Sequence, residues 1–183
     1  MSKATLKKEL ALMDSEQLRQ VIIEAYGVSK DFAAYFEYFL NPDPEALLEK
    51  TMKTLRKEIL RFKYRTCKAR ISVIRKELKK FIAYQPGHDY VAKLMMNIVG
   101  IFANLDSAGY DCTRPQLNGL EKIIGDYLRL GEESGELEQF VKRYEEFVSE
   151  ASDRRYFRLF LLRAANSALA EITSAPGLSM SGK

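Results

Sequence analysis

Cysteine and histidine are scarce in this sequence of 183 residues, which holds two cysteines and one histidine. Cys67 and Cys112 lie far apart and form no C-x-x-C pair, so we expect no disulfide framework and a reducing cytoplasm. These residues cannot supply the four ligands of a Cys/His zinc site. We expect Cys67 to be an inert, partly buried thiol, although Arg65 and Lys68 flank it. The glutamates between residues 132 and 146 resemble a solvated acidic face, not a metal site.

Catalytic signals are equally sparse. A Ser-His-Asp or Cys-His arrangement would have to use His88, which follows Pro86-Gly87 in a predicted turn. We therefore expect His88 to be an exposed turn residue. No G-x-G-x-x-G pattern occurs among the ten glycines, and we expect no phosphate-binding loop. The sequence predicts a non-enzymatic protein with no catalytic residue, no cofactor and no metal.

Long apolar runs are also missing. No run approaches the roughly 18 residues that cross a bilayer as a helix. Residues 1–10 are charged and have no apolar centre, which is not typical of a signal peptide. We expect a cytoplasmic protein that has no membrane partner.

Proline and glycine number only five and ten, and several of them lie between apolar runs, a pattern that favours helices. No stretch alternates with period two. We predict an all-α protein of eight or nine helices without a sheet, arranged as an irregular orthogonal bundle or a short stack of helical hairpins. Residues 1–173 should form one domain, and residues 174–183 a disordered tail. Asp89–Ser107, which is apolar nearly all round, should be the central helix.

A group of aromatic residues recurs at helical spacing near the N-terminus. Phe32, Tyr35, Phe36 and Phe39 share one predicted face, with Tyr38 to the side. Such a face could stack on nucleic-acid bases, but it is more often part of a core. We expect a core face, with Tyr38 turned outward.

The most unusual stretch is Lys50–Lys80, which carries thirteen Lys and Arg against two Glu. Its net charge is +11, whereas the whole chain is +4, so the remaining residues sum to −7. A concentrated basic segment in an otherwise acidic protein indicates an anionic partner. It does not identify that partner.

Two readings of residues 45–84 compete. Two amphipathic stripes and the absence of Gly and Pro between Pro44 and Pro86 allow a single long helix. The alternative is two helices with a break at Phe62–Lys68, where helix propensity is low. Because globular helices average about 12 residues, we favour the break.

Nine residues of this segment are candidates for binding an anion or a partner. On an unbroken helix, six of them would share an arc of about 80° that could contact a row of phosphates. The others could help to hold a smaller anion at a helix N-terminus. The candidates are Lys57, Arg61, Arg65, Lys68, Arg70, Ser72, Arg75, Lys76 and Lys79.

The acidic C-terminal half offers a competing use for this charge. From Glu121 to Asp153 there are ten acidic and four basic residues, so internal pairing could neutralise the basic surface. We expect such charge balancing. For function, we expect a non-enzymatic protein-interaction module that uses a groove between helical hairpins. The alternative is a nucleic-acid-binding protein that uses the basic segment 56–80. The oligomeric state stays open.

The first 85 residues resemble a bacterial family known only as a domain of unknown function. The resemblance rests on Ser2–Leu10 (SKATLKKEL), on Tyr38–Pro42 (YFLNP), on Leu47–Lys50 (LLEK) and on Lys68–Ser72 (KARIS). It implies an all-helical cytoplasmic protein. Relatives often carry Pro or Gly near Phe62–Cys67, which supports a break there. The resemblance implies no activity, cofactor or catalytic residue.

Overall fold

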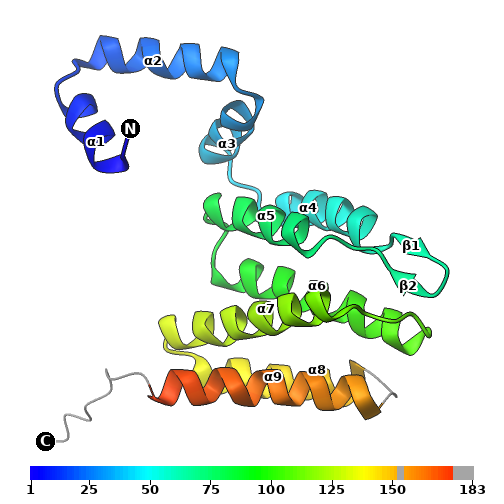
Figure 1. The fold of residues 1–183 in the computed structure, drawn as a ribbon. Coiled ribbons are helices and arrows are strands. Elements are labelled where there is room, and N and C mark those ends of the chain that lie inside the picture. Colours follow the sequence, from blue (N-terminus) through cyan, green and yellow to red (C-terminus); the bar gives the residue numbers. More distant parts are fainter. Residues whose placement is uncertain (152–154, 175–183) are drawn as a thin grey trace, which may run out of the picture. The chain divides into compact units, whose positions relative to one another are not determined.

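The computed structural model describes residues 1–151 and 155–174 (Figure 1). The chain divides into two compact units, Met1–Asp43 and Pro44–Lys183. Of the tail expected at residues 174–183, Ser174 ends the last helix, and the others lie outside the described residues. The helices of the first unit are α1 (Lys3–Ala11), α2 (Ser15–Val28) and α3 (Lys30–Leu40).

Each helix of the first unit begins at a polar cap. The Ser2 hydroxyl accepts the Thr5 amide in α1, and Asp14 forms a reciprocal capping box with Gln17 in α2. Ser29 caps α3 by accepting the Phe32 amide. These contacts satisfy amide groups that the first turn of a helix leaves without partners. Local sequence signals therefore account for where the three helices begin.

The predicted aromatic core face is wrong in the first unit. None of the residues in α1, α2 or α3 is buried. Phe36 stacks between Phe32 and Phe39, with ring centroids 5.8 and 6.1 Å apart. Phe39 is nevertheless 63% exposed, and Tyr38, expected to face outward, is half-buried. The aromatic side chains pack mainly against each other, because three short helices cannot enclose them.

The second unit is a stack of three helical hairpins (Figure 1). Its elements are α4 (Pro44–Ile59), β1 (Phe62–Lys63), β2 (Thr66–Cys67), α5 (Ile71–Ala83), α6 (His88–Ser107), α7 (Arg114–Glu133), α8 (Leu137–Ala151) and α9 (Arg155–Ser174). The layers are α4 with α5, α6 with α7, and α8 with α9. The described part of the chain thus confirms the all-α class, with nine helices.

The central layer carries much of the core. α6 and α7 each contain nine buried residues, among them Leu94, Ile98 and Ile123, which have no exposed surface. α6 lies against α4 and α7, and α7 lies against α8 and α9. The apolar segment predicted to be central is therefore in the middle layer, and α7 shares that position.

Glycines allow α7 to approach its neighbours closely. A Cβ at Gly119 would overlap the Ile71 side chain of α5, and a Cβ at Gly131 would lie 2.6 Å from Cγ of Phe140 in α8. At Gly125 the nearest heavy atom, Cβ of Ala168, would be 3.7 Å away, an ordinary contact. The first two glycines are thus required for packing, whereas Gly125 is not.

Gly131→Ala should lower the free energy of unfolding by about 1–3 kcal/mol, because the new methyl group overlaps a fully buried ring. Gly125→Ala is the matched change on the same helix. It should be neutral or stabilising by up to about 1 kcal/mol, since alanine favours helix and the new methyl group makes only ordinary contacts. Chemical denaturation of both variants checks this, and equal losses would contradict the α7–α8 packing.

Candidate functional site

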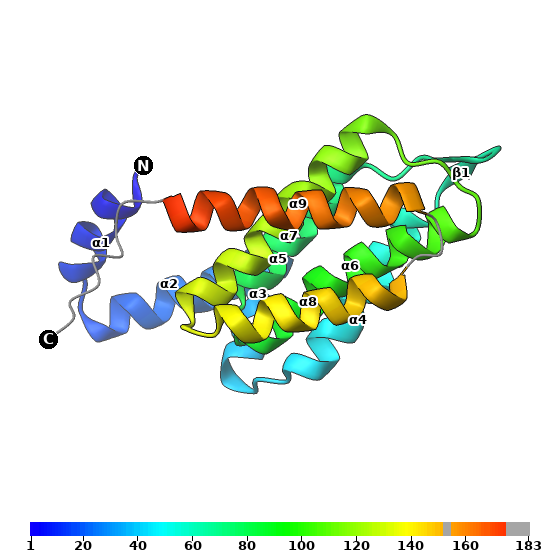
Figure 2. The same cartoon turned by 90° about the horizontal axis from the view of Figure 1, so that it is seen from below.

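The basic segment contains the predicted break, and a β-hairpin fills it. α4 ends at Ile59 and α5 begins at Ile71, which confirms two helices. β1 and β2 pair antiparallel, with Phe62 opposite Cys67 and Lys63 opposite Thr66. The expectation of no sheet thus fails for this one short pair. The hairpin projects beyond the neighbouring helix ends (Figures 1 and 2).

Backbone and side-chain hydrogen bonds fix the hairpin to the start of α7. Cys67 donates its amide to the Asp111 carbonyl at 3.2 Å, and Asp111 donates to the Arg65 carbonyl at 2.9 Å. The buried Gln116 side chain donates from Nε2 to the carbonyls of Cys67 at 3.2 Å and Ala69 at 2.9 Å. A projecting hairpin would otherwise be mobile, so these contacts hold its residues in place.

A carboxylate closes the hairpin at its base. Glu58, near the end of α4, accepts hydrogen bonds from Arg70 Nε at 2.9 Å, Arg70 Nη2 at 2.7 Å and the Arg70 amide at 2.8 Å. Arg61 Nη1 also donates to Glu58, at 3.2 Å. Arg61 precedes the hairpin and Arg70 follows it, so one acid joins its two ends. The hydrogen bonds from Arg70 lower the pKa of Glu58 to about 2, although burial alone would raise that pKa.

The candidate binding residues lie on several elements and not on one helix. Arg61 and Arg70 are held by Glu58 and serve the structure of the hairpin. Arg65 is in the hairpin loop, and Lys68 follows β2. Lys57 is on α4, and Ser72, Arg75, Lys76 and Lys79 are on α5. The shared arc required an unbroken helix, so it does not exist.

Two residues at the hairpin tip were not among the candidates. Lys63 ends β1, and Tyr64 follows it in the two-residue loop. Tyr64 is 90% exposed and has a φ of 55°, a left-handed conformation that hairpin loops usually give to Gly, Asn or Asp. An aromatic residue between Lys63 and Arg65 is visible in the sequence, but only the hairpin shows that it projects.

We call Lys63, Tyr64, Arg65 and Lys68 the basic hairpin surface. None of its three cations forms an ion pair with a described residue.

The acidic half does not neutralise the candidate residues as expected. Within the described ranges, the only ion pairs of the nine candidates are those of Arg61 and Arg70, and both involve Glu58. Acids of α7 and α9 pair instead with Arg129. The positive charge at the hairpin tip is therefore available to a partner.

Cys67, at the end of β2, is buried, and Cys112 is partly buried. Cys67 is fully buried, and its thiol donates to the Ile59 carbonyl at 3.5 Å. Burial raises the pKa of the Cys67 thiol, and it raises the pKa of Cys112 to about 12. Because the thiolate is the reactive form, neither thiol is set up as a nucleophile. The cations next to Cys67 in sequence do not reverse this effect.

His88 is the first residue of α6, and it is exposed. It borders a cavity of about 540 Å³ that Asp126, Arg129 and Glu133 also line. Among the described residues, no group of three or more His, Cys, Asp or Glu side chains could hold a metal ion. Within the described ranges the His88 side chain forms no hydrogen bond or ion pair.

The C-terminal residues contain one match to the spacing of a phosphate-binding loop. Gly177–Lys183 reads G-x-x-x-x-G-K. In nucleotide-binding proteins this motif follows a strand. Here the element before it is the helix α9, and the motif itself lies outside the described residues. The spacing alone therefore does not indicate a nucleotide site.

No described helix is both long and apolar enough to cross a membrane. Searches of curated proteins and of solved structures gave no match to this chain. A family model matches residues 1–109, which include the first unit, the hairpin and α6. This confirms the resemblance seen in the first 85 residues and extends it. The chain therefore belongs to the family of unknown function DUF6155.

Proposed function

We propose that this chain is a cytoplasmic bacterial protein that acts by binding, and that the basic hairpin surface binds single-stranded nucleic acid. The observation that carries the proposal is the exposed Tyr64 at the tip of an anchored hairpin, with Lys63 and Arg65 on either side. Proteins that bind single strands combine cations for the phosphates with aromatic rings for the bases. No described carboxylate forms an ion pair with the cations of this surface, although the exposed Asp111 lies beside it.

The backbone at Tyr64 supports this role. A left-handed conformation costs a residue with a side chain about 1 kcal/mol relative to glycine. Because Tyr64 is exposed, packing of its side chain in the core does not offset this cost. Phe62, in contrast, stacks on Tyr110 at 4.4 Å and helps to anchor the hairpin. A strained, exposed aromatic residue is better explained by a ligand than by folding.

Tyr64→Gly separates binding from folding. The variant should keep or slightly raise the melting temperature, because glycine relieves the backbone strain. Its affinity for a fluorescent single-stranded oligonucleotide should fall about 5- to 150-fold, the equivalent of one lost stacking contact. Tyr64→Phe is the matched control and should bind like the unmodified chain. Fluorescence anisotropy with DNA and RNA of the same sequence measures all three proteins and distinguishes the two nucleic acids.

Unchanged affinity in Tyr64→Gly would overturn the role of the ring. Equal affinity for duplex and single strands would also contradict the proposal, because paired bases cannot stack on a side chain.

Protein binding is a second candidate function, and the first unit favours it. Three capped helices that bury none of their residues leave Ile23 65% and Phe39 63% exposed. Ordering a chain without burying apolar surface is costly, so a protein with an apolar surface would stabilise this unit.

Ile23→Glu with Phe39→Glu tests this candidate. If these side chains bind another protein, the double variant should have the melting temperature of the unmodified chain. It should also fail to retain a partner that the unmodified chain retains from nuclease-treated lysate. A large fall in the melting temperature would show that the side chains support the fold of the chain itself.

A further inference from the structure

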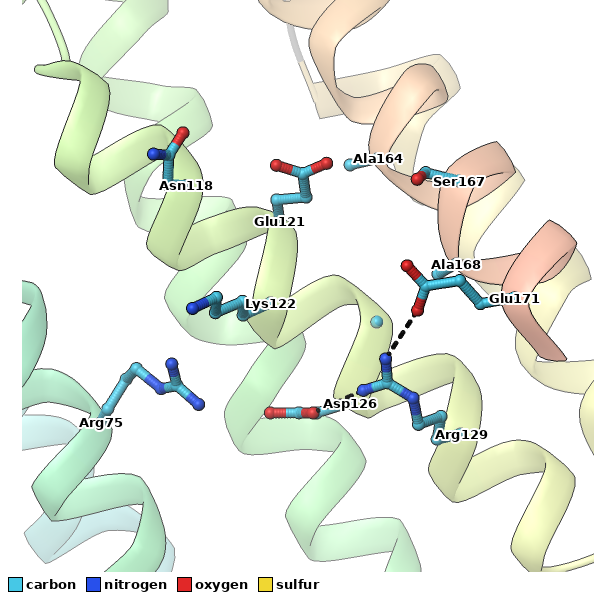
Figure 3. A pocket seen from close by; sticks show the side chains of 11 residues that line it. Arg75, Asn118, Glu121, Lys122, Asp126, Arg129, Ala164, Ser167, Ala168 and Glu171 are labelled. Atoms are coloured by element: carbon cyan, nitrogen blue, oxygen red, sulfur yellow. Dashed lines mark hydrogen bonds and ion pairs between the residues drawn. The ribbon is translucent and has the colours of Figure 1, made fainter. Parts of the chain in front are cut away.

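A cavity of about 570 Å³ lies between α5, α7 and α9, within the size range of small-molecule sites (Figure 3). Its wall contains small residues at the helix contacts, among them Gly125, Ala164 and Ala168. A Cβ at Gly125 would lie 3.7 Å from Cβ of Ala168, an ordinary contact, so α7 and α9 approach each other closely at this part of the wall. Charged side chains surround this space, and they determine what it can hold.

At one end of the cavity two carboxylates share one cation, which leaves a net charge of −1. Arg129 donates from Nη1 to Asp126 and from Nη2 to Glu171, both at 3.0 Å, and so joins α7 to α9. Figure 3 shows these two contacts as dashed lines. Asp126 and Glu171 therefore share one cation and act as a structural clamp.

The other charges have no such partner. Arg75 of α5 is half-buried and Lys122 of α7 is exposed, and both line the cavity. The two side chains extend toward each other on the side of α7 that faces α5 (Figure 3). Within the described residues neither cation forms an ion pair, and Glu121 forms none either. Glu121 belongs to α7, and its side chain extends toward α9 (Figure 3). The cavity thus offers two cations on one side and one carboxylate on the other.

We propose that this cavity binds a small dicarboxylic amino acid. The two carboxylates of the ligand would meet Arg75 and Lys122, and its ammonium group would meet Glu121. Arg75 is also the one sequence-predicted candidate that lines this cavity. This proposal is independent of nucleic-acid binding, because the basic hairpin surface contributes no residue to the cavity.

Isothermal titration calorimetry with L-glutamate, L-aspartate and glutarate tests the proposal on the full chain at low salt. At least one amino acid should bind with a Kd below about 1 mM. Arg75→Gln and Lys122→Gln should each weaken the binding of that amino acid at least about tenfold, as expected for loss of a charge-assisted hydrogen bond. Glu121→Gln should lower the affinity for the amino acid. It should leave the affinity for glutarate unchanged, because glutarate lacks the ammonium group. Lys76→Gln, an exposed neighbour on α5, should change nothing.

Absence of binding heat with both amino acids at about 5 mM would overturn the proposal. Glutarate binding as tightly as glutamate would overturn the role of Glu121. Arg75→Gln should leave oligonucleotide affinity unchanged, so failure here and failure of the proposed function can be told apart.

Discussion

Replacing Glu58 by Gln should lower the free energy of unfolding by about 2–3 kcal/mol, the cost of leaving a buried set of charge-assisted hydrogen bonds unmatched. The Glu58 side chain is only 10% exposed and receives four side-chain contacts and one backbone contact from Arg61 and Arg70. An amide cannot accept on both terminal atoms, so at least one arginine N–H group loses its acceptor. Chemical denaturation at neutral pH measures the loss.

The same carboxylate predicts a pH dependence. Its pKa is lowered to about 2 in the folded chain, from a value near 4.5. Its contribution is therefore complete above about pH 4.5 and is lost as the pH falls toward 2. The stability difference between the unmodified chain and Glu58→Gln should shrink over that range. Glu49→Gln, an exposed glutamate on the same helix, is the control and should show little loss at any pH. A constant difference down to pH 2 would contradict the role of the charge.

Reversing Lys63, Arg65 and Lys68 to Glu should weaken single-strand binding at least about 100-fold at low salt, because phosphate attraction becomes repulsion at three positions. The melting temperature should hardly change, since none of the three forms an ion pair with a described residue. Anisotropy and thermal denaturation of the same samples give both readouts.

A matched control changes the net charge equally at another place. Lys3, Lys7 and Lys8 are exposed on α1, and their reversal to Glu should reduce binding much less. Equal losses in the two triple variants would show a general charge effect. A marked fall in melting temperature after the hairpin reversal would instead support the internal charge balance expected from the sequence.

Periodicity and caps predict the helices because both signals are local. The stripe from Leu48 to Phe62 and the low helix propensity of Phe62–Lys68 predict the break, although α4 already ends at Ile59 and Phe62 lies in β1. The hairpin was not predictable in the same way. Each strand has only two residues, too few for a period-two pattern, and its loop lacks the usual glycine or asparagine.

The candidate site was partly predictable. A concentration of charge is visible in the sequence, and it includes Arg65 and Lys68, which stay candidates. The pairing of Arg61 and Arg70 with Glu58 is not visible there, because Glu58 becomes buried only when the two ends of the hairpin meet over α4. The exposure of the Tyr64 side chain depends on the hairpin and on the positive φ of Tyr64, and no residue pattern in the sequence indicates either.

The salt dependence of oligonucleotide binding by the unmodified chain tests the central claim most directly. Three phosphate contacts predict a log–log slope of affinity against salt near −2 for a single strand, at about 0.7 per contact. The hairpin reversal should remove that dependence together with the binding. A slope near zero, or no measurable binding to any single strand at about 50 mM salt, would contradict nucleic-acid recognition by the basic hairpin surface.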